Sequence, residues 1–298
     1  MHKLQQCWVL LLLLFLPVAL AARQTSDKFL QRKYKGNGNN RYRMTTNVEH
    51  NGKWQSTIEA ICELIEEDSS GIPSEEVWWA TKKVYTPKDT AGSYEDLGNT
   101  AVYKISLHPL GKLELPPITQ PSLTGEITDF HTFFVAISPK LGIGKLHHAG
   151  ERYKKPDFVQ GNFSNGKDIL TGQDCLDVTT TLQELNNKEA VIITSFLPPS
   201  SNCLQFILPE MQTPVAGDTL NNFQMVKPTT GEKVNVFFGN ETFIIRSILR
   251  KKDGVLVSAT MDNRLTLRLK VNCNKDYSNC QTTIPFTIKR TVHLELMK

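Results

Sequence analysis

The fold of this chain is decided by the stretch from Gly231 to Cys273, GEKVNVFFGNETFIIRSILRKKDGVLVSATMDNRLTLRLKVNC. Over residues 265–271 apolar side chains alternate with Thr, Arg and Lys, which is the pattern of a strand with one buried and one solvated face. Asp253-Gly254 and Asp262-Asn263 interrupt the apolar runs, and these residue types tolerate the positive φ of hairpin turns. The stretch predicts four consecutive antiparallel strands joined by tight turns.

Similar patterns recur along most of the remaining chain. They predict further strands at residues 76–86, 100–107, 129–138, 178–185, 190–197, 203–208 and 281–296. Prolines recur between residues 109 and 125, where missing backbone donors make a central strand unfavourable and a linker or crossing segment more suitable. Strands do not alternate with long helices, so a parallel sheet is not indicated.

These patterns predict a mainly β or β-dominated α+β fold. We expect an antiparallel meander sheet forming a sandwich or half-barrel, with few short helices. The proline-rich segment suggests an N-terminal β region at 41–118 and a C-terminal β region at 125–298, or one continuous domain.

The Asn51-Gly52 pair lies between two alternating runs and is a strong hairpin signal. Before it, Tyr42, Met44, Thr46 and Val48 would share one face. A helix over residues 57–66 is the alternative, because a capping-box pattern precedes apolar residues at helical spacing. We predict the hairpin.

Residues 1–22 combine a basic start, a short apolar core and small residues at the end, which is typical of a secretory signal peptide. We therefore expect a secreted protein, periplasmic if the source is bacterial, and no later segment predicts a membrane span. In an oxidising compartment the cysteines are expected to pair as Cys273–Cys280 and Cys175–Cys203. Cys62 would then be free and buried, or bonded to another chain.

Basic residues outnumber acidic ones over residues 23–40. This composition predicts either a flexible arm for polyanions or a solvated leader. The whole chain has 34 Lys plus Arg and 30 Asp plus Glu, and this near balance argues against nucleic-acid binding over its whole surface. Asn162 and Asn240 begin N-glycosylation sequons that we place at turns.

Few residues suggest catalysis or a cofactor. Ser164 and Lys167 match S-x-x-K, but Asn165-Gly166 between them would break the helix that such a pair needs. His131, His147 and His148 are weak metal candidates because their spacing fits no known zinc pattern. No phosphate-binding glycine loop is present, so we expect no cofactor and favour a non-enzyme.

The number of alternating strands favours a binding protein with a hydrophobic ligand, such as a lipid, in a sheet-lined cavity. Candidate lining residues are Trp54, Trp79, Phe133, Phe237 and Phe243. Two alternatives remain open at this point. One is an extracellular matrix or adhesion module that contacts polyanions or another extracellular protein, and the other is a hydrolase built around His131, His147, His148 and Asp168.

Overall fold

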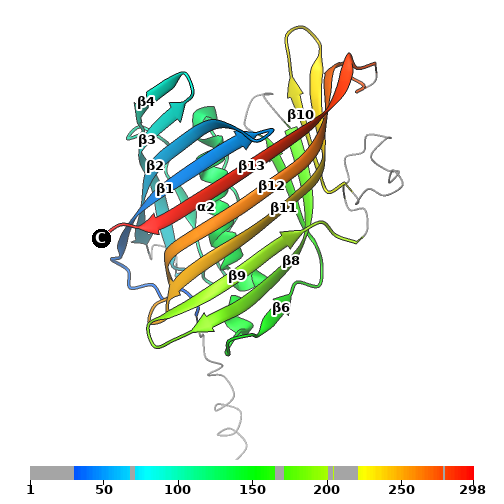
Figure 1. Ribbon diagram of the computed structural model, residues 1–298. Coiled ribbons are helices and arrows are strands. Elements are labelled where there is room, and N and C mark those ends of the chain that lie inside the picture. The colour runs from blue at the N-terminus through cyan, green and yellow to red at the C-terminus, as the bar shows by residue number, and fades with distance from the viewer. Residues whose placement is uncertain (1–29, 68–70, 165–170, 201–203, 205–220, 278) are drawn as a thin grey trace, which may run out of the picture.

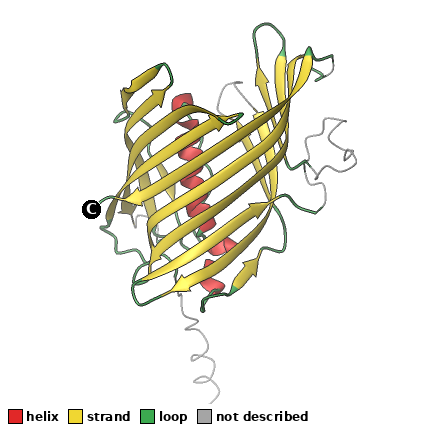
Figure 2. Cartoon of the chain, viewed as in Figure 1, coloured by secondary structure: helices red, strands yellow, loops and turns green. Residues whose placement is uncertain are grey.

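The computed structural model describes residues 30–67, 71–164, 171–200, 204, 221–277 and 279–298. These residues form a sheet of 13 strands that follows the path β10-β8-β9-β11-β12-β13-β1-β2-β3-β4. The sheet curves around helix α2 (Thr124–Ala136), which lies against its concave face (Figures 1 and 2). The predicted antiparallel, mainly β fold is confirmed, and its single curved sheet corresponds to the half-barrel.

The elements have the following bounds in chain order. The strands are β1 (Asn39–His50), β2 (Lys53–Glu67), β3 (Ser74–Thr86), β4 (Asp89–Asp96), β5 (Tyr103–Ile105), β6 (Arg152–Lys154), β7 (Val159–Ser164), β8 (Thr171–Leu185), β9 (Glu189–Leu197), β10 (Phe223–Pro228), β11 (Val234–Arg250), β12 (Val255–Cys273) and β13 (Thr282–Leu296). Short 3-10 helices lie at η1 (Pro121–Leu123), η2 (Pro139–Leu141) and η3 (Ile143–Lys145).

Two features of the topology place the site described below. β1 pairs with both β2 and β13, so the first and last described strands of the chain lie side by side in one sheet. β9 and β10 both lie between β8 and β11, end to end: β9 pairs with residues 243–250 of β11, and β10 pairs with residues 234–239. Residues 240–242 of β11 therefore lie where one inserted strand gives way to the other.

The predicted hairpin at Asn51-Gly52 is confirmed. Both turn residues have positive φ, +49° and +72°, and β2 continues as a strand through residues 57–66, so the helical alternative is wrong. Tyr42, Met44 and Thr46 are buried on one face as their alternation predicts.

The stretch 231–273 forms two long strands, β11 and β12, and not the predicted four. The turn at Asp253-Gly254 is confirmed, with Gly254 at a φ of +67°. Asp262 and Asn263 lie inside β12, where they pair with Ile244 and Phe243 of β11. Their side chains point to opposite faces, Asp262 outward to Arg264 and Asn263 inward. The residue types at 262–263 therefore predicted a turn where the strand continues.

The strand predicted at residues 129–138 is also wrong, because these residues form most of α2. Helical spacing places Phe130, Phe133 and Phe134 in the core. The Phe130 ring meets Tyr42 and Trp79 of the sheet edge to face, with centroids 6.1 and 5.7 Å apart. Packing against the sheet has overridden the local preference of these aromatic residues for strands.

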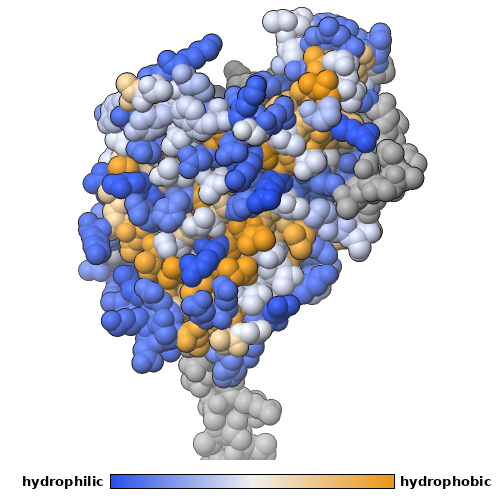
Figure 3. All heavy atoms as spheres, viewed as in Figure 1, coloured by the Kyte–Doolittle hydropathy of each residue, from blue (hydrophilic) through white to orange (hydrophobic). Residues whose placement is uncertain are grey.

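Other predicted strands have mixed outcomes. Those at 76–86, 178–185, 190–197 and 281–296 are confirmed as β3, β8, β9 and β13. Of the strand predicted at 100–107 only the short β5 forms, β4 was not predicted, and 203–208 lies outside the described residues except for Leu204. The outer face of the sheet, seen in Figure 3, mixes hydrophilic with hydrophobic residues. Leu197 and Ile244 are among the exposed large apolar side chains of the protein.

From Leu30 onward, the predicted basic arm is part of the fold. The Arg32 side chain is buried and forms ion pairs with Glu66 and Glu75. Glu66 also accepts hydrogen bonds from the backbone N–H groups of Lys35 and Gly36, at 2.7 and 2.9 Å. The charge of Arg32 is therefore neutralised by carboxylates of this chain. Residues 23–29 of the predicted arm lie outside the described residues.

Cys273 and Cys280 form the predicted disulfide. Cys175 is buried and disulfide-bonded, and its predicted partner Cys203 lies outside the described residues. Cys62 is free and buried as predicted, and burial raises the pKa of its thiol well above the usual value.

Gly239 provides a test of the close approach between β11 and β12. A methyl group there would lie 2.3 Å from the carbonyl oxygen of Thr266, and its φ of +150° is rarely adopted by other residues. We expect Gly239→Ala to lower the free energy of unfolding by about 3 kcal/mol, measured by urea denaturation. Gly231→Ala, in the turn between β10 and β11, is the control, with positive φ but open space around it, and should cost about 1 kcal/mol. Equal losses would contradict the close approach.

Candidate functional site

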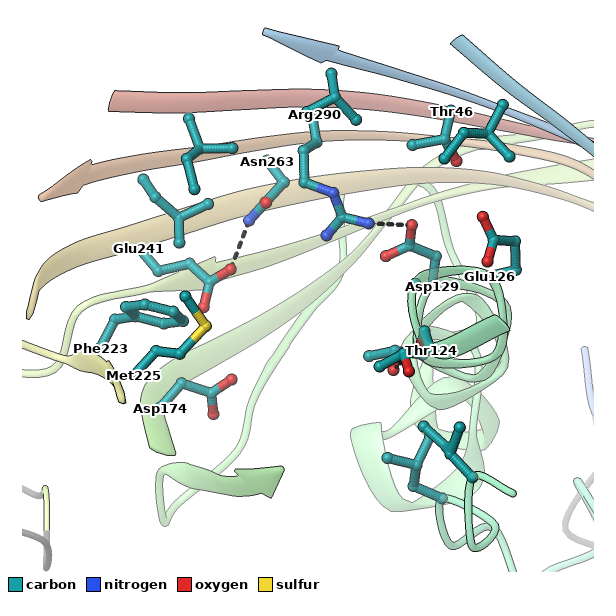
Figure 4. Close-up of a pocket in the computed structure, with 18 residues that line it drawn as sticks. Thr46, Thr124, Glu126, Asp129, Asp174, Phe223, Met225, Glu241, Asn263 and Arg290 are labelled. Carbon is teal, nitrogen blue, oxygen red and sulfur yellow. Dashed lines mark hydrogen bonds and ion pairs between the residues drawn. The ribbon is translucent and has the colours of Figure 1, made fainter. Parts of the chain in front are cut away.

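A cavity of about 380 Å³ lies between α2 and the concave face of the sheet (Figure 4). It falls within the range of roughly 300–1,000 Å³ typical of small-molecule sites. The lining residues come from β1, β2, β8, β10–β13, α2 and the segment before η1: Thr46, Val48, Ile58, Leu115, Ile118, Thr124, Gly125, Glu126, Thr128, Asp129, Asp174, Phe223, Met225, Glu241, Asn263, Leu265, Ile288 and Arg290.

Most of the cavity wall is apolar. Val48, Ile58, Leu265 and Ile288 come from neighbouring strands, and Leu115 and Ile118 come from the proline-rich segment. Phe223 and Met225 add an aromatic ring and a flexible thioether from β10. Such a wall gains free energy by covering the apolar part of a ligand.

The polar residues of the cavity include an ion pair that joins the helix to the sheet. Arg290 of β13 contacts the Asp129 carboxylate of α2 (Figure 4). Desolvation raises the pKa of Asp129, opposed by the charge of Arg290. A second pair, Lys82 with Glu126 at 3.2 Å, also joins the sheet to α2. Each cation is thus matched by one carboxylate of the helix.

Glu241 of β11 is a buried carboxyl, 8% exposed, that faces the same cavity. Its Oε1 accepts a hydrogen bond of 2.7 Å from the side-chain amide of Asn263. Desolvation, followed by the negative charge of Asp174, raises the pKa of Glu241 to about 8. Asn263 is 2% exposed, and its Oδ1 has no hydrogen-bond partner among the described residues.

Asp174 of β8 is the second carboxyl of the cavity that forms no ion pair with a described residue. Burial raises its pKa to about 6, although the Gly161 N–H donates to its Oδ1 at 2.9 Å. The buried Asn222 fixes the two strands, since its Nδ2 donates to the carbonyls of Cys175 and Glu241 at 3.1 and 3.0 Å. The two carboxyls are therefore held next to the junction of β9 and β10.

The five aromatic residues predicted to contact a ligand lie elsewhere. Trp54 is 40% exposed near the first hairpin turn, and Phe133 is buried in α2. Phe237 packs in a cluster with Phe223 and Leu265, and Phe243 stacks on Phe196 with ring centroids 4.2 Å apart. Trp79 lines a smaller cavity of about 210 Å³ with Tyr103 and Pro116. None of the five lines the larger cavity, and ligand contact by them stays a prediction.

The histidine candidates are not brought together. His131 is buried on α2, and burial lowers its pKa, whereas His147 and His148 are exposed after η3. Asp168 lies outside the described residues, and among those that are described no group of three or more His, Cys, Asp or Glu could hold a metal ion. The structure thus does not assemble the proposed hydrolase residues that it describes.

Both sequon asparagines lie within strands and not at the predicted turns. Asn162 is in β7, and Asn240 is in β11. Glycosylation of either one stays a prediction. Across the described ranges, no helix has the length and apolar character needed to cross a bilayer.

The polar residues of the cavity were not among the predicted site residues. Their signal is a polar residue at an inward position of a strand that is otherwise apolar on that face. Arg290 interrupts the inward series Phe286, Ile288, Val292 and Leu294, and Asn263 lies between Met261 and Leu265. Alternation predicted β13 and residues 265–271 of β12, whereas Asn263 was assigned to a turn, and these inward polar residues mark the site.

Comparisons with known proteins do not identify a family. No family model matches the chain, and no curated protein matches it. Among solved structures, one of lipovitellin, titled for lipid–protein interactions in that protein, superposes with a TM-score of 0.42 and 9% sequence identity. The match covers 89% of this chain and 26% of the lipovitellin chain, so this chain spans about a quarter of that protein. This similarity is below that of a shared fold.

The ion pair between helix and sheet can be tested with Asp129→Asn. The change removes the counter-charge of Arg290, and we expect a loss of about 3 kcal/mol of unfolding free energy, as for breaking a buried pair. Asp262→Asn is the matched control, because Asp262 pairs with Arg264 on the exposed face and such a pair contributes less than about 1 kcal/mol. Urea denaturation of both variants gives the comparison, and similar losses would show that Asp129 is not a structural partner.

The raised pKa of Glu241 predicts how stability depends on pH. A carboxyl with a folded-state pKa of about 8 binds more protons folded than unfolded, so its contribution is full below the unfolded pKa of about 4.3 and is lost as pH rises through about 8. Each pKa unit of difference corresponds to about 1.4 kcal/mol. We expect Glu241→Gln to flatten the decline in unfolding free energy between pH 5 and 8. Glu59→Gln, on the exposed side of β2, should leave it unchanged, and a wild-type slope in Glu241→Gln would contradict the assignment.

Proposed function

We propose that the protein is a secreted binding protein that carries an apolar small molecule, such as a lipid, between α2 and the concave face of the sheet. The observation that supports this is the cavity of about 380 Å³ with apolar walls from several strands and the proline-rich segment. The inward polar groups would orient the ligand, since sites of this kind combine apolar walls with a few polar contacts. The leader-like residues 1–22 support export.

The apolar wall predicts that the affinity for a ligand rises with the length of its alkyl chain. Each CH₂ of a ligand buried in the cavity should contribute about 0.8 kcal/mol, or about fourfold in Kd. A series of 1-alkanols from hexanol to decanol therefore should bind with rising affinity until the cavity is filled. Isothermal titration calorimetry of the delipidated full-length protein measures this series.

A larger side chain at Gly125 would fill the cavity without displacing the residues that line it. It lines the cavity from α2, and a Cβ built there meets no atom within 4 Å. We expect Gly125→Phe to weaken 1-octanol binding at least tenfold, because the ring would occupy the space of the ligand. Gly125→Ala is the matched control: both changes favour the helix, but a methyl leaves most of the cavity open.

The outcomes separate clearly. Strong octanol binding by Gly125→Phe, with unfolding free energy at or above wild type, would place the ligand elsewhere. Failure of every alkanol to bind the wild-type protein would remove the carrier proposal.

A further inference from the structure

The cavity has a polar end with an unequal charge balance. Its cations, Arg290 and the adjacent Lys82, are each paired with a carboxylate of α2. No described residue that faces the cavity forms an ion pair with Glu241 or Asp174, and the charge of Arg290, which attracts Glu241, is shared with Asp129. If all of these groups are ionised, the cavity carries excess negative charge, which opposes the entry of a carboxylate or phosphate.

The polar end of the cavity also has a hydrogen-bond acceptor without a donor. Asn263 donates through Nδ2 to Glu241, and its own Oδ1 accepts no hydrogen bond from the described residues although the residue is 2% exposed. A buried acceptor left without a donor costs free energy. Asn263, Glu241 and Asp174 together present acceptors to the cavity. Asn263 and Glu241 lie on the paired strands β12 and β11, and Asp174 lies on β8 across β10, whose Phe223 and Met225 appear between the two carboxyls in Figure 4.

We propose that this end of the cavity binds the ammonium group of a cationic amphiphile, whose alkyl chain lies along the apolar wall. The inference deepens the proposed carrier function and rests on it. An ammonium has three donors and no acceptor, so it matches the oxygens of Glu241 and Asp174 and the free Oδ1 of Asn263. A fatty acid would bring acceptors and negative charge to the same place.

The groups around Glu241 determine how its protonation would respond to a bound cation. The charged or titratable groups facing Glu241 are Asp174 on β8, Glu126 and Asp129 on α2, and Arg290 on β13. β10 contributes Phe223 and Met225 and β12 contributes Asn263 and Leu265, and none of these titrates. A bound ammonium would favour the ionised forms of Glu241 and Asp174, so binding would release protons when the pH lies below their raised pKa values.

Three probes of equal chain length test the proposal: octylamine, 1-octanol and octanoate, each below its micelle-forming concentration. We expect the wild-type protein to bind octylamine roughly tenfold or more tightly than 1-octanol, and octanoate more weakly than either. Octylamine affinity should rise between pH 6 and 8, because Glu241 and Asp174 lose their protons over this range while the amine stays charged. The affinity for 1-octanol should change little over the same range.

Variants assign the effect to the carboxyls. Glu241→Gln should abolish the preference for octylamine and its pH dependence while retaining 1-octanol binding. Glu59→Gln, on the exposed side of β2, should behave as wild type. If Glu241→Gln fails to fold, Asp174→Asn and the three-probe comparison on the wild-type protein give the answer independently.

The possible failures are distinguishable. Binding of 1-octanol without a preference for octylamine, or an unchanged preference in a folded Glu241→Gln, overturns the cationic ligand and leaves the carrier proposal standing. Failure of all three probes to bind overturns both.

Discussion

The structure depends on the contact between helix α2 and the concave face of the sheet. Phe130, Phe133 and Phe134 of the helix are buried in the main core, and Phe130 meets both Tyr42 and Trp79. Burial of side chains this large is a strong driving force for folding. Since an open sheet of this kind would otherwise expose its concave face, α2 provides the second layer that the fold requires.

The same arrangement leaves room for the cavity. α2 covers only part of the concave face, and the Arg290–Asp129 and Lys82–Glu126 pairs join the helix to strands on its two sides. Breaking such pairs costs stability because a buried charge remains. Glu241, Asn263 and Asp174 lie beyond the helix near the β9–β10 junction, where Asn222 bridges β8 and β11. The polar end is thus built into the frame of the sheet.

Several local signals failed for one shared reason. Asp262-Asn263 has the residue types of a turn, yet these residues continue β12 because pairing with β11 and β13 satisfies their backbone groups. Residues 129–138 resemble a buried strand, yet 129–136 are helical, since only a helix places Phe130, Phe133 and Phe134 together on the sheet. In both places long-range packing outweighs local preference.

The sequence by itself determined the class of the protein: alternating runs, the Asn51-Gly52 turn and the Cys273–Cys280 spacing were enough for an antiparallel, disulfide-containing β protein. These features are local, because alternation follows from the geometry of one strand and a hairpin from adjacent residues. Only the tertiary structure decided that Asp174, Glu241, Asn263 and Arg290 face one cavity beside α2. Their meeting depends on strand order and on the curvature of the sheet around the helix, which arise from contacts between distant segments and leave no pattern in neighbouring residues.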